Sequence, residues 1–252
     1  MLLEGKKAII TGGAQGIGKE ICDIFCQEGA DIILADVNIE KAKQAAKIIS
    51  EKTKRKCVPF KVDISKREDI EKMVNMAISE FGKIDILVNN AGVHLSRLIV
   101  DMSEEDWDRI MNINLKGTFL CSQIAGREMI KQKSGKIVQI STCSAKKPTI
   151  LEGAYSASKA GILGFNRVLA AELGPYGINC NCVLPGATDT EMIRNSFLTS
   201  PEVEQEWIEK TALKRLGRPV DQARVVLFLA SYLSDHITGE SIVVSAGEMM
   251  SQ

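Results

Sequence analysis

Two ionisable side chains lie one helical turn apart in the segment YSASK, which spans residues 155–159. Tyr155 and Lys159 are at positions i and i+4, so a helix would place both on one face. A free tyrosine has a pKa of about 10, and a neighbouring ammonium favours its ionised form. The pair is therefore a candidate for general acid–base catalysis, although this spacing is common by chance and carries little weight alone.

Small hydroxyl side chains precede the tyrosine, and Ser141, Thr142 and Ser144 are the candidate partners. Successive residues of a strand point to opposite faces of a sheet, so Ser141 and Thr142 should not both face Tyr155. Ser144 should lie beyond the end of the strand. The local sequence alone leaves the choice among the hydroxyls open.

A glycine-rich turn, TGGAQGIG at residues 11–18, could bind a phosphate group. Gly12, Gly16 and Gly18 allow a tight turn and a close approach of the backbone to a ligand. The N–H groups at the start of the next helix would face an anion, helped by the helix dipole. The turn lies between an apolar strand and a helix, which is the context of a dinucleotide-binding site.

Asp36 ends the second expected strand, twenty residues after Gly16 (36 − 16 = 20). A carboxylate is expected at this position to bind the ribose diol of an adenosine. It would repel the 2′-phosphate of NADP, no arginine follows at position 37 or 38, and residue 15 of the turn is a glutamine. We therefore expect NAD as the cofactor, and its oxidised nicotinamide would add a positive charge near Tyr155.

The composition excludes several other classes of protein. Lys+Arg and Asp+Glu both count 32 in 252 residues, so no global charge attracts nucleic acid or an anionic membrane. No apolar run approaches the length of a membrane span, and the N-terminal segment does not resemble a signal peptide. The seven cysteines match no disulfide or zinc pattern. We expect a soluble, cytoplasmic protein without a metal site, and without nucleic acid or membrane as a partner.

Apolar strand-like runs alternate with amphipathic helical patterns along most of the chain, which predicts parallel strands joined by helical crossovers. The apolar runs IDILV and KIVQI are typical of strands buried on both faces. The fold class is therefore α/β, a Rossmann-like doubly wound parallel sheet of about seven strands with helices on both faces, in one domain covering 1–252. The expected strands cover residues 6–11, 31–36, 56–63, 83–92, 136–142, 177–186 and 241–247.

A polar segment at 187–217 interrupts this alternation before the last helix and strand. Its pattern is helical, and it follows the carboxyl end of a strand, where binding sites of α/β folds lie. We expect this insert to form a helical substrate lid.

The motifs together resemble the short-chain dehydrogenase/reductase family. TGGAQGIG, Asp63, NNAG at 89–92, Asn114, YSASK and LPGATDT at 184–190 occur in the family's order and at its intervals. The resemblance covers essentially the whole chain. It implies an enzyme that interconverts a secondary alcohol and a ketone by hydride transfer to or from a nicotinamide cofactor.

The resemblance also implies roles for individual residues. Tyr155 would be the acid–base catalyst, Lys159 its partner, and Asn114 would hold a water that links the lysine to solvent. The substrate-orienting hydroxyl of the family lies thirteen residues before the tyrosine, which gives Thr142 (155 − 13 = 142), where serine is usual. The implied cofactor-binding residues are Gly12, Gln15, Gly16, Ile17, Gly18, Asp36, Val37, Asp63, Ile64, Asn90, Ala91, Gly92, Tyr155, Lys159, Pro185, Gly186, Thr188 and Thr190.

Two other functions remain to be weighed. An NADPH-dependent 3-oxoacyl-(acyl-carrier-protein) reductase would share these motifs, but Asp36 opposes NADPH. Tyr176 also stands where carrier-binding relatives tend to have a basic residue, although Lys133 keeps the other basic position. A non-enzymatic nucleotide-binding sensor should have lost Tyr155 or Lys159, and this chain retains both.

The substrate and the assembly are less defined by the sequence. His94 and Glu152 lie near the expected site, and each either contacts substrate or is an ordinary surface residue. Trp107 and Trp207 are expected to anchor helices. The helices around 115–130 and 155–173 are apolar on more than one face, which suggests a subunit interface. The family resemblance implies a homotetramer, with a dimer as the alternative.

Overall fold

A computed structural model describes residues 1–250 apart from 148 and 199. The described residues form one seven-stranded sheet in the order β3-β2-β1-β4-β5-β6-β7, with every pairing parallel. The strands are β1 (Lys7–Thr11), β2 (Asp31–Asp36), β3 (Cys57–Lys61), β4 (Ile86–Asn89), β5 (Gly135–Ile140), β6 (Ile178–Pro185) and β7 (Ser241–Val244). This confirms the predicted Rossmann-like doubly wound sheet.

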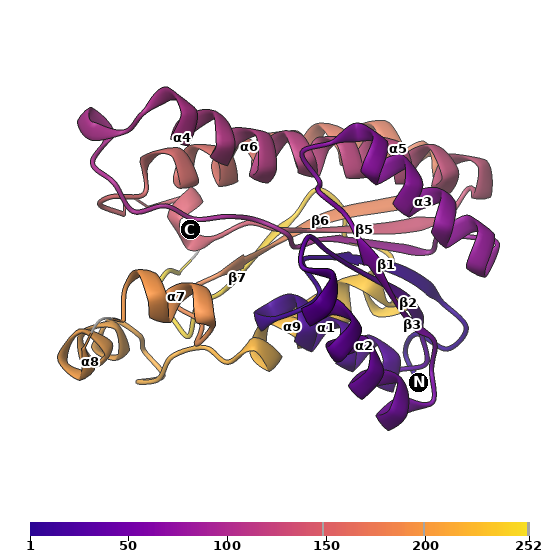
Figure 1. Cartoon of the computed structure of the whole chain (residues 1–252), viewed down its shortest axis with the longest axis horizontal. Helices are drawn as coiled ribbons and strands as arrows, with labels where there is room; N and C mark the ends of the chain where they lie inside the picture. Colours follow the sequence, from indigo (N-terminus) through magenta and orange to yellow (C-terminus); the bar gives the residue numbers. More distant parts are fainter. Residues whose placement is uncertain (148, 199, 251–252) are drawn as a thin grey trace.

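Helices cover both faces of the sheet (Figure 1). One face packs against α1 (Gly16–Gln27), α2 (Ile39–Thr53) and α9 (Pro219–Ala230) in a core that includes Phe25 and Leu34. The opposite face packs against α3 (Arg67–Phe81), α5 (Gly117–Gln132) and α6 (Gly153–Leu173). Strand order reverses between β1 and β4, so a crevice opens at the carboxyl ends of these strands, where α/β folds bind ligands.

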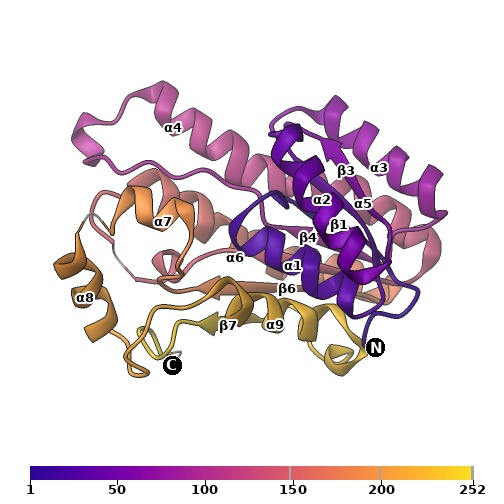
Figure 2. The same cartoon turned by 60° about the horizontal axis from the view of Figure 1, so that its bottom comes forward.

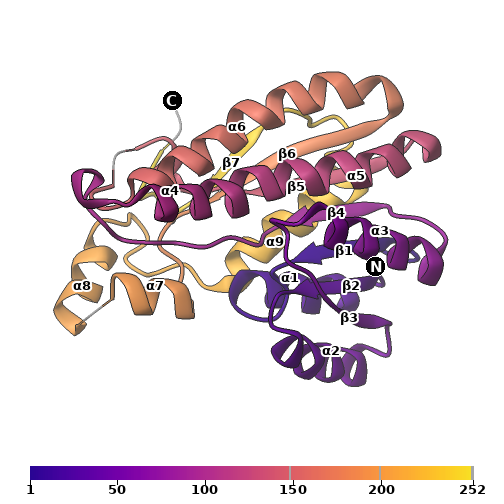
Figure 3. The same ribbon diagram turned by 45° about the horizontal axis from the view of Figure 1, so that its top comes forward.

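The helical segment between Ser103 and Lys133 is not one regular helix. It consists of α4 (Glu104–Ile110), a π-helical segment (Met111–Lys116) and α5, which follow one another along the face of the sheet (Figure 3). The π-helical segment contains the buried Asn114. Because a π-helical turn widens the helix locally, it changes the direction of side chains without ending the helix.

The insert predicted at 187–217 contains two short helices, α7 (Glu191–Ser196) and α8 (Pro201–Glu209). Thr190 is the N-cap residue of α7, and Ser200 is the N-cap residue of α8. Each hydroxyl accepts a hydrogen bond from a backbone N–H of the first turn. Figure 2 shows both helices together at one end of the molecule, far from the N-terminus. The insert therefore lies at the edge of the sheet where the crevice opens.

None of the helices in the described part of the chain combines the length and the apolar character needed to cross a membrane. All seven cysteines are buried as free thiols. Burial raises the pKa of the Cys180 and Cys182 thiols to about 12, so both stay protonated at neutral pH. These residues pack as small hydrophobic side chains.

Candidate active site

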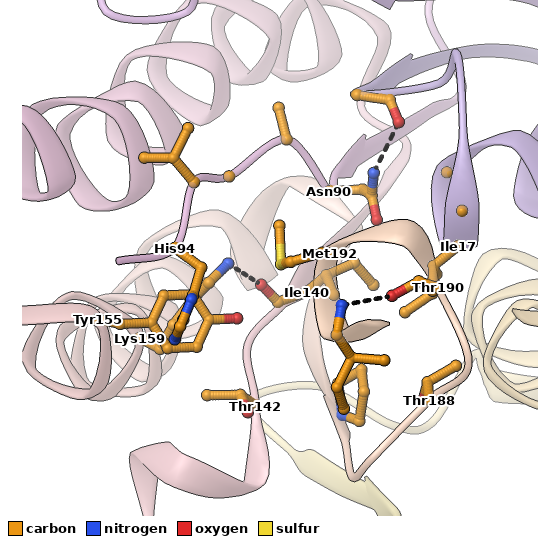
Figure 4. Close-up of a pocket in the computed structure, with 18 of the residues that line it drawn as sticks. Ile17, Asn90, His94, Ile140, Thr142, Tyr155, Lys159, Thr188, Thr190 and Met192 are labelled. Atoms are coloured by element: carbon orange, nitrogen blue, oxygen red, sulfur yellow. Dashed lines mark hydrogen bonds between the residues drawn. The ribbon is translucent and has the colours of Figure 1, made fainter. Parts of the chain in front are cut away.

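One cavity of about 700 Å³ at the carboxyl edge of the sheet is lined by nearly all the predicted site residues. Asn114 is the exception, since it lies behind the cavity wall. Figure 4 shows Tyr155, Lys159 and His94 together on one side of the cavity, with Ile17, Thr188 and Thr190 across from them. Residues separated by more than 170 positions along the chain therefore meet at one site.

The glycine-rich turn joins β1 to α1 and is packed too closely to hold larger side chains. Gly12 and Gly16 have φ values of 66° and 55°, in the left-handed region that favours glycine. A Cβ atom on Gly18 would lie 2.0 Å from the Gly12 carbonyl oxygen, and one on Gly12 would lie 2.8 Å from Ala91 Cα. The turn therefore requires glycine for steric reasons, and it leaves the first N–H groups of α1 facing the cavity.

The segment after β4 braces this turn. Asn90 Nδ2 donates hydrogen bonds to the carbonyl oxygens of Thr11 and Gly12, each at 3.0 Å. Thr11 Oγ1 accepts hydrogen bonds from the N–H groups of Asn90 and Ala91, both at 3.1 Å. The NNAG motif thus holds the glycine turn in position, and this bracing role is visible without a ligand.

Asp36 lies at the end of β2 and lines the cavity, as predicted. Its carboxylate accepts hydrogen bonds from the N–H groups of Ala14 (3.1 Å) and Asn38 (2.9 Å). These bonds orient the carboxylate beside the glycine turn. Val37 follows it, is 64% exposed, and also lines the cavity.

Asp63 and Ile64 lie beyond β3 at the same edge and line the cavity. Asp63 Oδ1 accepts hydrogen bonds from the Ser65 hydroxyl (2.6 Å) and the Ser65 N–H (3.0 Å). The hydroxyl bond is the main reason that the pKa of Asp63 is lowered from its ordinary value. Asp63 is therefore a fixed, ionised acceptor at this position.

Tyr155 and Lys159 lie one turn apart on α6, and both line the cavity. Lys159 is 3% exposed, and its Nζ donates a hydrogen bond to the Ile140 carbonyl oxygen at 2.8 Å. The same Nζ lies 5.8 Å from the centroid of the Tyr155 ring. Burial lowers the pKa of Lys159 to about 8 because the ammonium is removed from water.

The expectation of an easily ionised phenol is not met by the groups of the chain itself. Burial raises the pKa of Tyr155 above its ordinary value, and the negative charge of Glu152 raises it further. The sequence argument considered the Lys159 ammonium but not the carboxylate at Glu152, three residues before the tyrosine. Any lowering of the pKa of Tyr155 toward neutral pH must therefore come from a bound group that supplies a positive charge or donates a hydrogen bond to the phenolate.

The structure excludes one of the three candidate hydroxyls near Tyr155, although all three residues line the cavity. Ser141 is buried, and its hydroxyl proton is already donated to the Lys159 carbonyl oxygen at 2.9 Å. The Ser144 hydroxyl accepts a hydrogen bond from the Thr149 hydroxyl at 3.1 Å, and the Thr142 hydroxyl accepts one from the Ser144 N–H at 3.3 Å. Among the described residues, both therefore keep an O–H that can donate to a ligand. The contacts are compatible with Thr142, whose role stays a prediction.

Asn114 joins the segment after β4 to α6. Its Oδ1 accepts from the Val93 N–H at 2.8 Å, and its Nδ2 donates to the Val93 carbonyl oxygen at 2.9 Å and to Ser158 Oγ at 3.1 Å. A Cβ atom on Gly92 would lie 3.2 Å from Asn114 Oδ1 and 3.4 Å from Lys159 Nζ. Asn114 thus lies beside the lysine, while its predicted contact with a water stays untested.

The end of β6 and the segment that follows it form the wall opposite Tyr155. This wall consists of Pro185, Gly186, Thr188 and Thr190. The Thr188 hydroxyl donates to the Gly186 carbonyl oxygen at 3.0 Å and accepts from Gln222 Nε2 at 3.1 Å. A Cβ atom on Gly16 would lie 3.5 Å from Thr190 Cγ2, so the lid begins next to the glycine turn.

Several cavity residues were not predicted from the sequence. They are Lys41, Arg109, Lys147, Phe197, Trp207 and Glu248. Met192, Phe197 and Trp207 belong to the lid, so Trp207 contributes to the cavity in addition to packing its helix. No local pattern could have found these residues, because each reaches the cavity through the packing of its own segment: the lid, α2, α4, the loop after β5 or the C-terminal segment.

The parallel sheet, with the glycine turn and the Tyr155–Lys159 pair at its carboxyl edge, has the architecture of dinucleotide-binding α/β folds. Comparison with known proteins gives the family: a family model described as enoyl-(acyl carrier protein) reductase matches residues 12–248. The chain belongs to the short-chain dehydrogenase/reductase family, whose members are oxidoreductases that act on CH–OH groups.

Relatives with several functions match nearly the whole chain. A 3-oxoacyl-(acyl-carrier-protein) reductase FabG of Chlamydia muridarum is 39% identical over 247 residues, covering 98% of each chain. An NAD-dependent glycerol dehydrogenase of Listeria innocua is 38% identical, covering 96% of this chain and 93% of its own. A solved short-chain type dehydrogenase/reductase of Mycobacterium marinum superposes with a TM-score of 0.93 at 31% identity, covering 99% of this chain and 97% of its own.

Proposed function

We propose that this chain is an NAD-dependent dehydrogenase that interconverts a secondary alcohol and a ketone. The observation that carries the proposal is that Asp36, the glycine turn and the Tyr155–Lys159 pair line one cavity. A carboxylate at the end of β2 suits the ribose diol of NAD and opposes the 2′-phosphate of NADP. The NAD-dependent Listeria relative supports this choice of cofactor.

The residues present fit a dinucleotide. Side chains at Gly12 and Gly18 would collide with neighbouring backbone, so the turn is shaped to bring backbone N–H groups to a pyrophosphate. Asp36 would hold the adenosine ribose, and Asp63 and Ile64 would lie at the adenine. The nicotinamide end would be held by the residues that line the rest of the cavity, namely Asn90, Ala91, Gly92, Pro185, Gly186, Thr188 and Thr190.

In the proposed oxidation, Tyr155 accepts the proton of the substrate hydroxyl, and Thr142 donates a hydrogen bond to the same oxygen. A bound nicotinamide would accept the hydride from the carbinol C–H bond and, when oxidised, would supply a positive charge near the phenol. Lys159 adds a second positive charge near the ring and passes the proton toward solvent on the Asn114 side. A positioned acid–base group accelerates such a step by about 10²–10⁴-fold.

An NADPH-dependent 3-oxoacyl-(acyl-carrier-protein) reductase is the second candidate. The FabG relatives of Chlamydia muridarum and Thermotoga maritima favour it, at 39% identity each. Lys41, which lines the cavity together with Asp36, could also contact a 2′-phosphate. A sensor without catalysis is opposed by the retained Tyr155, Lys159 and Asn114 within one site.

A cofactor comparison tests the proposal. Initial rates are measured with NAD and NADP on a panel of secondary alcohols, and with NADH and NADPH on a 3-oxoacyl thioester. We expect the wild type to prefer NAD at least about tenfold in kcat/KM, and Asp36→Ala to lose about 10–100-fold with NAD, since a charge-assisted hydrogen bond contributes about 1.5–3 kcal/mol. A wild type that prefers NADPH with the thioester would establish the second candidate.

We also infer that the chain forms a homotetramer. Phe119 of α5 and Val168 of α6 are 38% and 57% exposed on neighbouring helices, and the Phe119 and Phe165 rings lie 6.0 Å apart. Such an apolar helix face supports self-association. Light scattering coupled to gel filtration gives the mass directly, and a mass near 27.5 kDa would exclude the tetramer.

A further inference from the structure

A buried hydrogen-bonded pair, His94 and Glu152, lies in the part of the cavity around Tyr155, which we call the substrate half. His94 Nε2 and Glu152 Oε1 are 3.1 Å apart, and the two side chains are only 4% and 6% exposed. His94 follows β4 and Glu152 precedes α6, so the residues are 58 positions apart in the chain. The Arg97 N–H donates to the Leu151 carbonyl oxygen at 2.9 Å and holds the two segments together. Both side chains line the cavity.

Each member of this pair has a polar atom without a partner in the structure. Glu152 Oε2 and His94 Nδ1 are both buried and make no hydrogen bond to the residues that the structure describes. Leaving a buried polar atom unsatisfied costs about 1–3 kcal/mol, more for a charged group. A fold that retains two such atoms on one pair of cavity-lining residues has a reason to do so, and a ligand that reaches the pair provides one.

The pair is next to the acid–base phenol. The His94 and Tyr155 ring centroids are 4.9 Å apart with the planes at 75°, and Figure 4 shows the two rings in contact. The Phe197 ring of the lid lies 5.0 Å from the His94 ring and 5.7 Å from the Trp207 ring. A group bound by the pair would therefore be close to the reacting carbon and covered by the lid.

The chemistry of the pair selects one kind of ligand group. A hydroxyl can donate to a carboxylate oxygen and accept from an imidazole N–H at the same time. A carboxylate on the substrate would be repelled by Glu152, and an alkyl or acyl chain would leave both polar atoms unsatisfied. A hydroxyl is a neutral group that can donate to Glu152 and can either donate to or accept from His94.

We propose that His94 and Glu152 bind a second hydroxyl of the substrate, on the carbon next to the reacting carbinol. The substrates are then vicinal diols and polyols rather than simple alcohols or acyl thioesters. This inference rests on the proposed alcohol dehydrogenase function. Phe197 covers His94, so the ring of Phe197 moves aside as the hydroxyl enters.

A matched pair of probes tests the subsite. The ratio of kcat/KM for 2,3-butanediol to that for 2-butanol is measured with NAD, with 3-amino-2-butanol as a third probe. We expect the wild-type ratio to be about tenfold or more, because a site built to bind a hydroxyl discriminates against its absence. His94→Phe and Glu152→Leu should bring the ratio close to one, whereas Glu152→Gln, which keeps an acceptor oxygen, should restore part of it.

Matched control variants exist in the same chain. His236, the second of two histidines, is exposed, so His236→Phe should leave the ratio unchanged. Glu206 is an exposed lid residue, so Glu206→Gln should also leave the ratio unchanged. A ratio that falls equally in these controls would contradict the assignment to His94 and Glu152.

Binding without turnover gives an independent readout. Tyr155→Phe combined with Trp107→Phe leaves Trp207 as the remaining tryptophan, in contact with the ring that covers His94. With NAD bound, fluorescence titration should give a Kd for 2,3-butanediol about tenfold or more below that for 2-butanol. Equal Kd values would overturn the subsite even if the enzyme is active.

The outcomes distinguish failure of the hydroxyl subsite from failure of the proposed dehydrogenase function. If the wild type oxidises the diol and 2-butanol with equal kcat/KM, the subsite is wrong and the dehydrogenase function stands. If it oxidises neither but reduces a 3-oxoacyl thioester with NADPH, the proposed function fails and the subsite with it. A preference for 3-amino-2-butanol over the diol would replace the hydroxyl site by an ammonium site.

Discussion

The two halves of the cavity differ in whether backbone or side-chain atoms line them. In the cofactor half, the glycine turn and the segment after β4 present mostly backbone, held by short-range packing and hydrogen bonds. In the substrate half, side chains from distant segments meet, as His94, Glu152 and Phe197 do. The comparison suggests that the cofactor half tolerates few substitutions, because backbone shape depends on specific residues. The substrate half can change its ligand by exchanging side chains.

The halves also differ in electrostatics. In the cofactor half, Asp63 is held ionised by hydrogen bonds from Ser65. In the substrate half, burial acts first, raising the pKa of Tyr155 and lowering that of Lys159 to about 8. Burial therefore favours the neutral forms of the two groups on which the proton transfer depends. This arrangement makes the acid–base step responsive to the charge that occupies the cofactor half.

The largest expected effect comes from removing the Tyr155 hydroxyl oxygen, which should impair catalysis without weakening NAD binding. Tyr155→Phe should lower kcat by about 10³-fold, since it removes the acid–base group, while the Kd for NAD stays within about threefold. Initial rates and a fluorescence titration measure the two quantities. The exposed Tyr176 supplies the control, and Tyr176→Phe should keep full activity. If Tyr155→Phe kept an activity within a few-fold of wild type, Tyr155 would not be the acid–base catalyst.

The second effect, that of Gly18→Ala, tests the steric requirement for glycine in the cofactor half. In Gly18→Ala the new Cβ would lie 2.0 Å from the Gly12 carbonyl oxygen, so the turn must shift. We expect the free energy of unfolding to fall by roughly 3 kcal/mol, the upper end for overpacking, and NAD affinity to fall with it. Urea unfolding at fixed protein concentration measures the first quantity.

Gly164 provides the matched control for this variant. It lies inside α6, and a Cβ atom there would have no heavy atom within 4 Å. Gly164→Ala should raise the free energy of unfolding by about 0.5–1 kcal/mol, because alanine is the better helix residue. If the two alanine variants were equally stable, the steric account of the glycine turn would be wrong.

The same contrast explains what the sequence could predict. All seven strands, the glycine turn and Asp36 follow from local patterns, since each depends on neighbours within a few residues. The π-helical segment around Asn114 was missed because one widened turn barely changes the apolar periodicity of a long helix. The contacts of Glu152 with His94 and Tyr155, and their effect on the pKa of Tyr155, depend on how distant segments pack.

The third effect concerns Lys159, which lies where the halves meet. Its pKa is about 8 when folded and 10.5 ordinarily, so between these values the unfolded chain binds more protons. The contribution of Lys159 to the free energy of unfolding therefore rises with pH in this window, by up to about 1.4 kcal/mol per pH unit. Below pH 8 both states are charged and the cost of burial is fully present.

Comparison with Lys159→Met isolates this contribution, because the other titrating groups are shared. We expect the wild type to gain about 1–2 kcal/mol relative to Lys159→Met between pH 7 and pH 9.5, measured by urea unfolding at each pH. A difference between the two proteins that does not change with pH would mean that the buried ammonium keeps its ordinary pKa.

The smallest expected effect concerns the contact between the cofactor half and the lid. Lys41 Nζ donates to Gln15 Oε1 at 2.8 Å and lies 3.3 Å from Glu191 Oε2 of α7. Because Lys41 and Glu191 are 48% and 58% exposed, the pair should contribute less than about 1 kcal/mol and weaken further in salt. Lys41→Met should therefore change the KM for NAD by less than about threefold.

Lys43→Met is the matched control, since Lys43 forms an exposed pair with Glu40 on the same helix at 3.0 Å, without reaching the lid. Equal small effects in both variants would show that the halves act independently. A loss of NAD affinity above about tenfold in Lys41→Met alone, reproduced by Glu191→Gln, would mean that the lid helps to hold the cofactor. Substrate specificity and cofactor affinity could then not be changed separately, because exchanging lid side chains would alter both.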